Sequence, residues 1–409
     1  MAVIDRTRAA LARLFYRYFF SLLLVVASAA QWAVAAWALQ VGLGLALPWW
    51  GHILTVAALY FFNRSITALR PRQATGAAFR AYTASAFVSL FCAAFLLAAA
   101  ALWGLTSTLL GALSAQALTV GAQSSLVAGI DGAFRWVASL GMLTIALTMG
   151  YGYAVGQHQL RVTRTTLPLR GLGRPLRVAQ ISDIHVGQNL TMPQLQRFVD
   201  QVNDLEADLI CVTGDIADSP AADYARFFPV LGELRARYGV CAILGNHDHY
   251  AGAQRVVDEL QQWTRFQVLR DEAVTLDADG AMLHVIGLDD RGRDWARGVL
   301  SDARLADLLE AAPGATPVLL LVHRPDVFHQ AAAAGVGLTL SGHTHGGQLA
   351  IPWFGGRRRN LAEFITAFDR GLYAARGVHL YVNCGLGVTG QRIRLFTPRE
   401  ISLFELQPA

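Results

Sequence analysis

The sequence predicts a chain of two parts, an all-α bundle of four transmembrane helices followed by an α/β domain. The first third carries long apolar runs without charged residues, and the rest alternates short β-branched runs with amphipathic stretches. The composition, 54% hydrophobic and 15% charged, is too apolar for an ordinary soluble protein of 409 residues. We expect a membrane domain at residues 1–156, a basic linker at 157–176 and the α/β domain at 177–409.

The four expected spans follow from where charge is absent. Residues 18–63 contain no Asp, Glu, Lys or Arg, a run too long for one crossing but suited to two of about 20 residues with a turn at 42–50. A third span is expected within 84–105 and a fourth within 134–156, both uncharged in their central portions. A cleaved signal peptide fits poorly, because its apolar core would have only about 7–15 residues.

Basic residues predict which side of the membrane the α/β domain faces. They lie before the first span, between the second and third, and after the fourth: Arg6, Arg8, Arg13 and Arg17; Arg64, Arg70, Arg72 and Arg80; Arg161, Arg164, Arg170, Arg174 and Arg177. By the positive-inside rule, we expect a multi-pass protein of the inner (plasma) membrane whose amino terminus and α/β domain face the cytoplasm. The net charge of +5 reflects this topology, and the sequence contains no nucleic-acid recognition module. The four cysteines show no disulfide pattern, which suits a reducing compartment.

Within the α/β domain, strand-like and helix-like segments alternate. We expect helices near residues 192–203, 222–238 and 253–263, and strands at 177–181, 208–213, 240–244, 282–287, 318–323, 338–341, 378–382 and 400–406. Alternation of this kind favours layers of sheet flanked by helices.

Five short polar segments carry the chemistry of this domain, and all but one directly follow an apolar run: residues 182–185, 214–218, 245–248, His323 and residues 342–345. Open α/β folds bind ligands at the ends of their strands. Asp183 and His185 are two residues apart, so both side chains of an extended segment point to one face and can hold one metal. Carboxylate, amide and imidazole donors without thiolate suit Mn, Fe, Zn or Mg rather than a structural zinc site.

Two of these residues have distinct expected roles. Asp215 follows a buried run, and its two carboxylate oxygens can contact two ions at once, so we assign it as a bridge. Asn246 offers a neutral oxygen, which limits the negative charge around an anionic substrate. This donor set favours phosphoryl chemistry.

The motif set D-x-H, G-D-x-x-D, G-N-H-D, H and G-H-x-H resembles that of the calcineurin-like metallophosphoesterases, over roughly residues 176–406. The resemblance implies a four-layer αββα sandwich and two divalent cations, with manganese expected and Fe, Zn or Mg as alternatives. It places the first ion on Asp183, His185, Asp215 and His345, and the second on Asp215, Asn246, His323 and His343. It also makes His247 the side chain that contacts the phosphate or protonates the leaving oxygen, and Asp218 the residue that orients it. A carboxylate on a ring nitrogen raises an imidazolium pKa on physical grounds as well.

The expected activity is a two-metal hydrolysis of a phosphodiester or pyrophosphate bond. Membrane-attached relatives imply a lipid-linked substrate, such as UDP-2,3-diacylglucosamine or a phospholipid. Trp353, Phe354 and the arginines at 357–359 form a cluster suited either to lipid headgroups or to a solvated loop. Two alternatives stay open: a phosphodiesterase for soluble nucleotides whose spans serve as anchor or sensor, and a membrane scaffold with a vestigial fold, although every ligand position is filled. The sequence does not define the oligomeric state.

Overall fold

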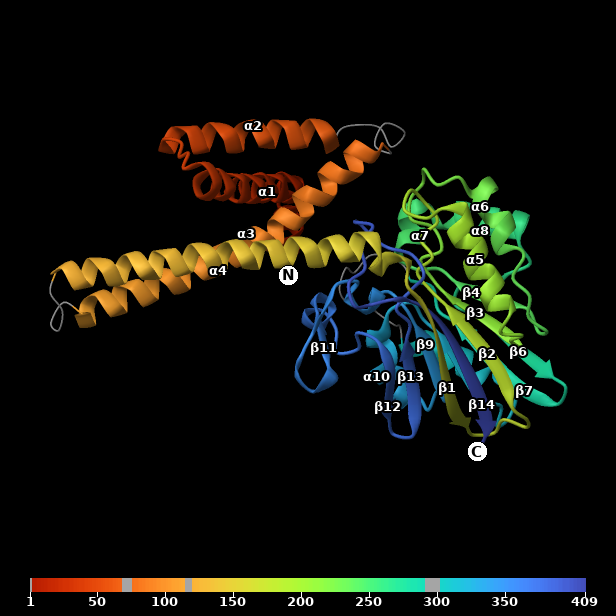
Figure 1. Ribbon diagram of the computed structural model, residues 1–409. Helices are drawn as coiled ribbons and strands as arrows, with labels where there is room; N and C mark the ends of the chain where they lie inside the picture. Colours follow the sequence, from red (N-terminus) through yellow and green to blue (C-terminus); the bar gives the residue numbers. More distant parts are fainter. Residues whose placement is uncertain (1, 68–75, 115–119, 291–301) are drawn as a thin grey trace. The chain divides into compact units, whose positions relative to one another are not determined.

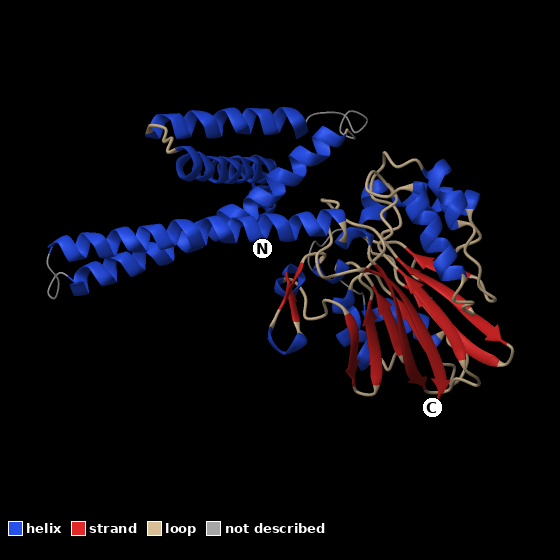
Figure 2. Cartoon of the chain, in the orientation of Figure 1, coloured by secondary structure: helices blue, strands red, loops and turns tan. Residues whose placement is uncertain are grey.

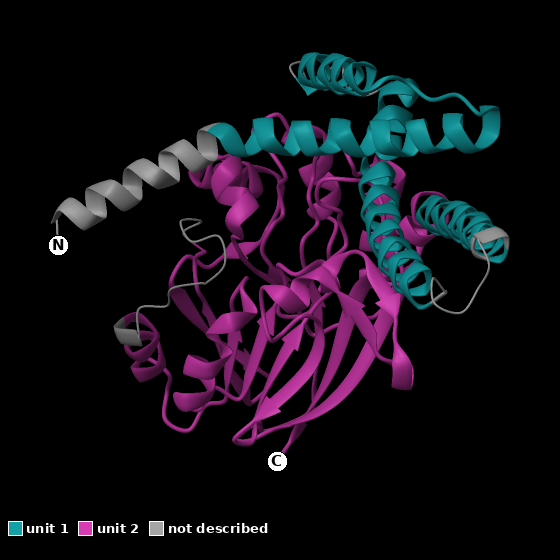
Figure 3. Ribbon diagram, turned by 90° about the vertical axis from the view of Figure 1, so that its left-hand side faces the viewer, with its two compact units in different colours: residues 1–150 teal, residues 151–409 magenta. Residues whose placement is uncertain are grey.

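The computed structural model describes residues 2–67, 76–114, 120–290 and 302–409. The chain folds into two compact units, Met1–Gly150 and Tyr151–Ala409, shown in teal and magenta in Figure 3. The expected connection that carries Arg70 and Arg72 lies outside the described residues. The last turn of the fourth helix already belongs to the second unit, because the boundary falls at Tyr151.

The first unit consists of long helices, coloured red to yellow in Figure 1. They are α1 (Ala2–Leu43), α2 (Trp49–Thr67), α3 (Ala77–Ser114) and α4 (Val120–Ala154). In the described part of the chain, three stretches are long and apolar enough to cross a membrane: Tyr18–Leu43, Ala77–Leu113 and Ser124–His158. α2 is not among them, because its 19 residues include the polar groups of His52, Asn63 and Arg64. The expected count of four spans is therefore not confirmed.

Asn63 ties α2 to two other helices by polar contacts. Its Nδ2 donates to Ser28 Oγ and to Gln31 Oε1 of α1, each at 2.8 Å. Its Oδ1 accepts a hydrogen bond from the hydroxyl of Tyr82 in α3 at 2.7 Å. The buried amide of Asn63 is thus satisfied, as buried polar groups in folded proteins generally are.

The second unit contains two six-stranded sheets, drawn in red in Figure 2. The first has the order β1 (Leu160–Leu169), β14 (Arg399–Pro408), β2 (Leu176–Ile181), β3 (Leu209–Thr213), β4 (Val240–Ile243), β5 (Gln267–Val268). The second has the order β12 (Gly371–Ala375), β13 (Val378–Val382), β9 (Leu338–Ser341), β8 (Val318–Leu321), β7 (Ala281–Gly287), β6 (Glu272–Ala278). β10 (Ala350–Pro352) and β11 (Arg358–Asn360) form a separate antiparallel pair. Strands β2, β3 and β4 run parallel in one sheet, and β7, β8 and β9 in the other.

Apolar side chains join these sheets into layers. One core cluster contains residues of both sheets, among them Cys211 of β3 and Leu319 of β8, and fills the space between them. Helices α5 (Met192–Asn203), α6 (Tyr224–Leu231) and α8 (Ala253–Trp263) contribute to the core on the outer face of the first sheet. Helices α9 (Asp302–Glu310) and α10 (Phe328–Ala333) contribute on the second sheet. The layer order is helices, sheet, sheet, helices, which agrees with the mixed α/β class that the alternation predicts.

The remaining elements are short and lie in the connections. They are α7 (Asn246–Ala251) and the 3-10 turns η1 (Gly156–His158), η2 (Pro325–Val327), η3 (His345–Gly347), η4 (Phe354–Gly356) and η5 (Leu361–Phe364).

β1 lies within residues that we expected to form a linker. Its ten residues pair in parallel with β14, from Leu160 opposite Arg399 to Leu169 opposite Pro408. Leu167 and Leu169 are buried, with 4% and 2% of their surface exposed. The polar, basic composition of this segment comes from the outward face of an edge strand, so the segment is part of the sheet rather than a free linker.

Candidate metal centre

The seven expected ligands gather where five strands end. In the first sheet, Asp183 and His185 follow β2, Asp215 follows β3 and Asn246 follows β4. In the second sheet, His323 follows β8, and His343 and His345 follow β9. Because these strands run parallel within each sheet, their carboxyl ends bring the side chains to one edge of the sandwich. All seven are buried except His343, which is half-buried.

The backbone is strained at the same positions. Asp183, His185, Asp215, His343 and His345 have φ angles between 49° and 71°, a left-handed conformation that is unfavourable for residues other than glycine. They account for five of the eleven such residues in the described part of the chain. Strain of this kind persists where the surrounding structure enforces it, and it gathers at functional sites.

Asp183, His185 and His345 form the first group of candidate ligands. The Nε2 atoms of the two imidazoles are 3.1 Å apart, and His345 Nε2 lies 3.5 Å from Asp183 Oδ1. The backbone N–H of His343 donates to both oxygens of Asp183, at 3.0 and 3.1 Å, and so fixes the carboxylate. Burial and the neighbouring His185 and Arg394 hold the pKa of His345 well below its usual value. The His345 ring is therefore neutral, the form that binds a metal ion.

Asp215, His323 and His343 form the second group. His323 Nε2 is 3.2 Å from His343 Nδ1. The other ring nitrogen, His323 Nδ1, donates to the carbonyl oxygen of Thr213 at 2.8 Å, so Nε2 faces the group. Burial alone would lower the pKa of His323, but Asp215 and Asp183 outweigh it and raise the pKa to about 10. The carboxylates thus favour a positive charge at this point, and a bound cation would supply it.

Asp215 belongs to the second group and also faces the first. Its Oδ1 accepts the backbone N–H of His247 at 2.8 Å. Its Oδ2 lies 3.7 Å from His185 Nε2 and 3.3 Å from His323 Nε2. The same oxygen therefore faces an imidazole of each group, which is the position that a bridging ligand needs.

Asn246 supplies a direct test of whether a cation fits here. Its Oδ1 is buried and finds no hydrogen-bond partner among the described residues. A buried acceptor left unsatisfied costs about 1–3 kcal/mol, so such an atom calls for an explanation. A cation held by Asp215, His323 and His343 would satisfy it. The oxygen and imidazole donors of both groups fit divalent ions of the Mn, Fe, Zn or Mg type.

His247 lies beside the first group, at the start of α7. Its ring packs edge-on against His185 with centroids 4.7 Å apart, and its Nδ1 is 3.4 Å from Asp218 Oδ1. Burial alone would lower the pKa of His247, but the contact with Asp218 and the charge of Asp215 raise it to about 9. Asp218 and Asp215 therefore favour the protonated form of the ring. Asp218 Oδ1 also lies 3.2 Å from His185 Nδ1, so one carboxylate orients both rings.

Asp248 holds the ligand loops together, a role that the sequence analysis did not assign. Its Oδ2 accepts the N–H groups of Gly245 at 2.8 Å and Ile216 at 3.2 Å, and its Oδ1 accepts that of Ala217 at 2.7 Å. The carboxylate therefore joins the loop after β3 to the loop after β4. Its place next to His247 was visible in the sequence, whereas two of its three partners are about 30 residues away.

Arg394 is a second residue that the sequence did not single out. It is fully buried and donates to the carbonyl oxygens of Cys384, Gly385 and Gly387, and its Nη2 is 3.3 Å from His345 Nδ1. These bonds pin the loop after β13 against the first ligand group. Gly385 in that loop has a φ of +74°, and a Cβ there would lie 2.7 Å from the Cβ of Asp183, so only glycine fits.

The layered fold and the two ligand groups, with Asp215 facing an imidazole of each, fit a phosphoric ester hydrolase that uses divalent cations. Comparison with known families agrees, because the calcineurin-like phosphoesterase family matches residues 176–347. A protein named uncharacterized metallophosphoesterase YkuE from Bacillus subtilis (strain 168) is 34% identical over 273 residues, which cover 63% of this chain and 90% of that protein. An uncharacterized metallophosphoesterase from Aquifex aeolicus (strain VF5) is 30% identical over 268 residues, or 64% of this chain and 98% of that protein.

A longer relative is also similar. The transmembrane protein with metallophosphoesterase domain from Bos taurus is 31% identical over 261 residues, which cover 61% of this chain and 57% of that protein. The chain belongs to the calcineurin-like metallophosphoesterase family, as its motifs indicate, and is a metal-dependent phosphoric ester hydrolase.

Proposed function

We propose that this protein is a membrane-anchored phosphoesterase with two metal ions that hydrolyses phosphodiester or pyrophosphate bonds of a lipid-linked substrate, such as UDP-2,3-diacylglucosamine or a phospholipid. The observation that carries the proposal is the pair of ligand groups, with Asp215 facing an imidazole of each, in a chain with three helices apolar enough to span a membrane. The relative from Bos taurus, named as a transmembrane protein, supports the membrane part.

The two ligand groups and His247 have different roles in the proposed reaction. Two bound divalent ions, expected to be manganese, would generate a nucleophile from water at neutral pH and neutralise phosphate charge. Asp215 holds the two groups in register, and Asn246 adds an oxygen without adding negative charge. His247, kept protonated by Asp218, donates a proton to the leaving oxygen of the substrate.

We further propose that α2 is a fourth span and that the catalytic unit faces the cytoplasm. The 19 residues of α2 are enough for one crossing. The hydrogen bonds of Asn63 with Ser28, Gln31 and Tyr82 reduce the cost of placing its amide in the bilayer. With four spans, both ends of the chain lie on one side, together with the basic residues that flank the spans.

A product analysis tests the substrate class. The full-length protein, purified in detergent and supplied with Mn²⁺, is offered lipid pyrophosphates, phospholipids, cyclic nucleotides and simple aryl phosphodiesters. We expect the lipid-linked substrates to give the highest kcat/KM. A preference for cyclic nucleotides would reject the lipid assignment in favour of the soluble-nucleotide alternative. Hydrolysis of none of the four, with both ions bound, would reject the proposed activity.

A further inference from the structure

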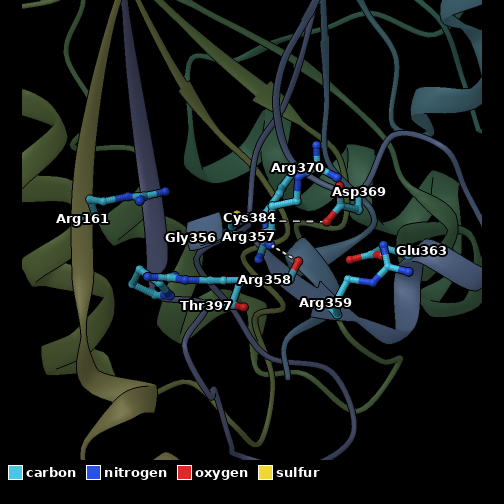
Figure 4. Close-up of a pocket in the computed structure, with 11 residues that line it drawn as sticks. Arg161, Gly356, Arg357, Arg358, Arg359, Glu363, Asp369, Arg370, Cys384 and Thr397 are labelled. Carbon is cyan, nitrogen blue, oxygen red and sulfur yellow. Dashed lines mark hydrogen bonds and ion pairs between the residues drawn. The ribbon is translucent and has the colours of Figure 1, made fainter. Parts of the chain in front are cut away.

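A basic cavity lies where β1 meets the segment after β10. It encloses about 470 Å³ and is lined by five arginines, Arg161, Arg357, Arg358, Arg359 and Arg370, with Glu363 and Asp369 as the carboxylates among its lining residues. Figure 4 shows Arg161 approaching from β1, whereas the other arginines come from the stretch around β11. None of these side chains is an expected metal ligand.

The positive charge of this cavity is only partly neutralised. Arg359 pairs with Glu363 at 2.9 Å, Arg161 lies 3.4 Å from the buried carboxylate of Glu400, and Arg370 lies 3.6 Å from Asp369. Within the described ranges, Arg357 and Arg358 have no ion pair. The guanidinium of Arg358 donates to the carbonyl oxygen of Phe396, and the carbonyl oxygen of Arg358 accepts a hydrogen bond from Arg370 Nη2 at 2.8 Å. The charges of these two guanidinium groups are therefore not balanced by a carboxylate, and guanidinium matches the oxygens of a phosphate group.

Exposed apolar side chains stand next to these arginines. Trp353 and Phe354 occupy the tip of the β10–β11 hairpin, and Phe364 ends η5. Phe354 and Phe364 are 85% and 89% exposed, and Trp353 is 54% exposed. Figure 2 shows this small hairpin beside the large sheets rather than within them. Aromatic residues combined with arginine are the composition of segments that rest in the headgroup layer of a bilayer.

The cavity is also tied to the end of a candidate span. The candidate span Ser124–His158 contains two charged residues, Asp131 and Arg135, so its uncharged part is residues 136–158. As a helix, this part is about 34 Å long, close to the thickness of the hydrocarbon core of a bilayer. Arg161 follows only three residues later, so at most about 10 Å of extended chain separates it from the membrane end of the span.

Direct contacts hold the same end against the cavity wall. The ring of Tyr151 stacks on Phe396 with centroids 6.4 Å apart, and the hydroxyl of Tyr153 donates to Gln391 Oε1 at 3.0 Å. Phe396 directly precedes Thr397 and Pro398, which line the cavity. The last residues of this candidate span are therefore held against the segment that lines the cavity.

We propose that this cavity binds the phosphate of an anionic phospholipid headgroup through Arg161, Arg357 and Arg358, while Trp353, Phe354 and Phe364 enter the bilayer interface. The contact would hold the catalytic unit against the membrane. It does not depend on the identity of the hydrolysed substrate.

The test uses the full-length protein in lipid nanodiscs. The four native cysteines are buried, so Phe354→Cys can be labelled selectively with a polarity-sensitive fluorophore. We expect blue-shifted emission in phosphatidylcholine discs containing about one third phosphatidylglycerol, compared with pure phosphatidylcholine. A label at Gln262→Cys, on the exposed surface of α8, should not respond. Equal emission at position 354 in both lipids would overturn the proposal.

Charge variants and free phosphate separate headgroup binding from other causes. Arg357→Gln with Arg358→Gln should weaken the response to phosphatidylglycerol, because each arginine removed lowers the affinity for the anionic surface by about fivefold. Arg226→Gln with Arg235→Gln makes the same charge change at exposed sites elsewhere and should leave the response unchanged. Equal effects of both pairs would overturn a specific cavity. Inorganic phosphate in pure phosphatidylcholine discs should not shift the emission, and a full shift with phosphate alone would overturn the lipid assignment.

Discussion

At the scale of single residues, the proposed mechanism depends most on Asp215 and His247. The two are linked, because the backbone N–H of His247 holds Asp215 Oδ1 while Asp215 Oδ2 faces both ligand groups. The side chain of His247 is left free to meet the substrate, with 26% of its surface exposed. One residue thus shapes the ligand groups and the other reaches the phosphate.

His247→Ala should lower kcat by about 10²–10⁴-fold while leaving the metal content unchanged, because a general acid is lost and no expected ligand is removed. Turnover and elemental analysis of the same preparation measure both quantities. His329→Ala, an exposed histidine outside the site, serves as the matched control. Wild-type turnover in the His247 variant with full metal content would remove His247 from catalysis.

The pH dependence follows from the raised pKa of His247. The acid form is the active one, so kcat should fall as the pH rises through about 9. Asp218→Asn removes the main contact that raises this pKa, so the alkaline limb of the profile should move to lower pH. Since Asp218 also contacts His185, metal content is measured at each pH. An alkaline limb unmoved in Asp218→Asn, at constant metal content, would contradict the assignment.

The candidate ligands were predictable from the resemblance of the motif set, and all of them except Asn246 belong to segments that follow apolar runs in the sequence. The left-handed backbone at Asp183, His185 and His345 was not predictable, since it results from the packing of loops from both sheets. The roles of Asp248 and Arg394 were not predictable from the sequence either. Most of their hydrogen-bond partners are main-chain groups, which leave no pattern in the sequence.

At the scale of elements, β1 shows where sequence patterns mislead. Its first seven residues are exposed or half-buried, so the segment has the composition of a linker. Only its pairing with β14, more than 200 residues later, makes it a strand. Strands buried on both faces, such as β3, were recognisable because every residue is apolar or small.

Insertion of one glycine after Arg164 tests this strand. Side chains alternate along a strand, so the insertion turns Leu167 and Leu169 away from the core. Burial of each leucine contributes roughly 1.5–3 kcal/mol, so the free energy of unfolding should fall by several kcal/mol. The temperature of half-inactivation measures the effect. One glycine inserted after Gly173, in the turn before β2, is the control. Equal tolerance of both insertions would show that the segment acts as a linker.

At the scale of the whole molecule, the number of spans decides which side of the membrane holds the catalytic unit. Three stretches qualify by length and apolarity, and α2 would make four. A reporter that is active only in the cytoplasm, fused after Ala409, should be active if α2 crosses and the amino terminus is cytoplasmic. The same reporter fused before Met1 shows on which side of the membrane the amino terminus lies. Opposite signals from the two ends would support three spans and contradict the proposed orientation.

The central claim is that Asp183, His185, Asp215, Asn246, His323, His343 and His345 hold two ions that serve hydrolysis. The most direct measurement is the metal content of the purified protein after loading with Mn²⁺ and removal of free ions. We expect two ions per chain in the wild type, one in His345→Ala and one in His323→Ala. Asp215→Asn should lose both affinity and turnover, because both ligand groups depend on it. Full activity of the wild type without bound metal, or two ions and normal turnover in Asp215→Asn, would contradict the account.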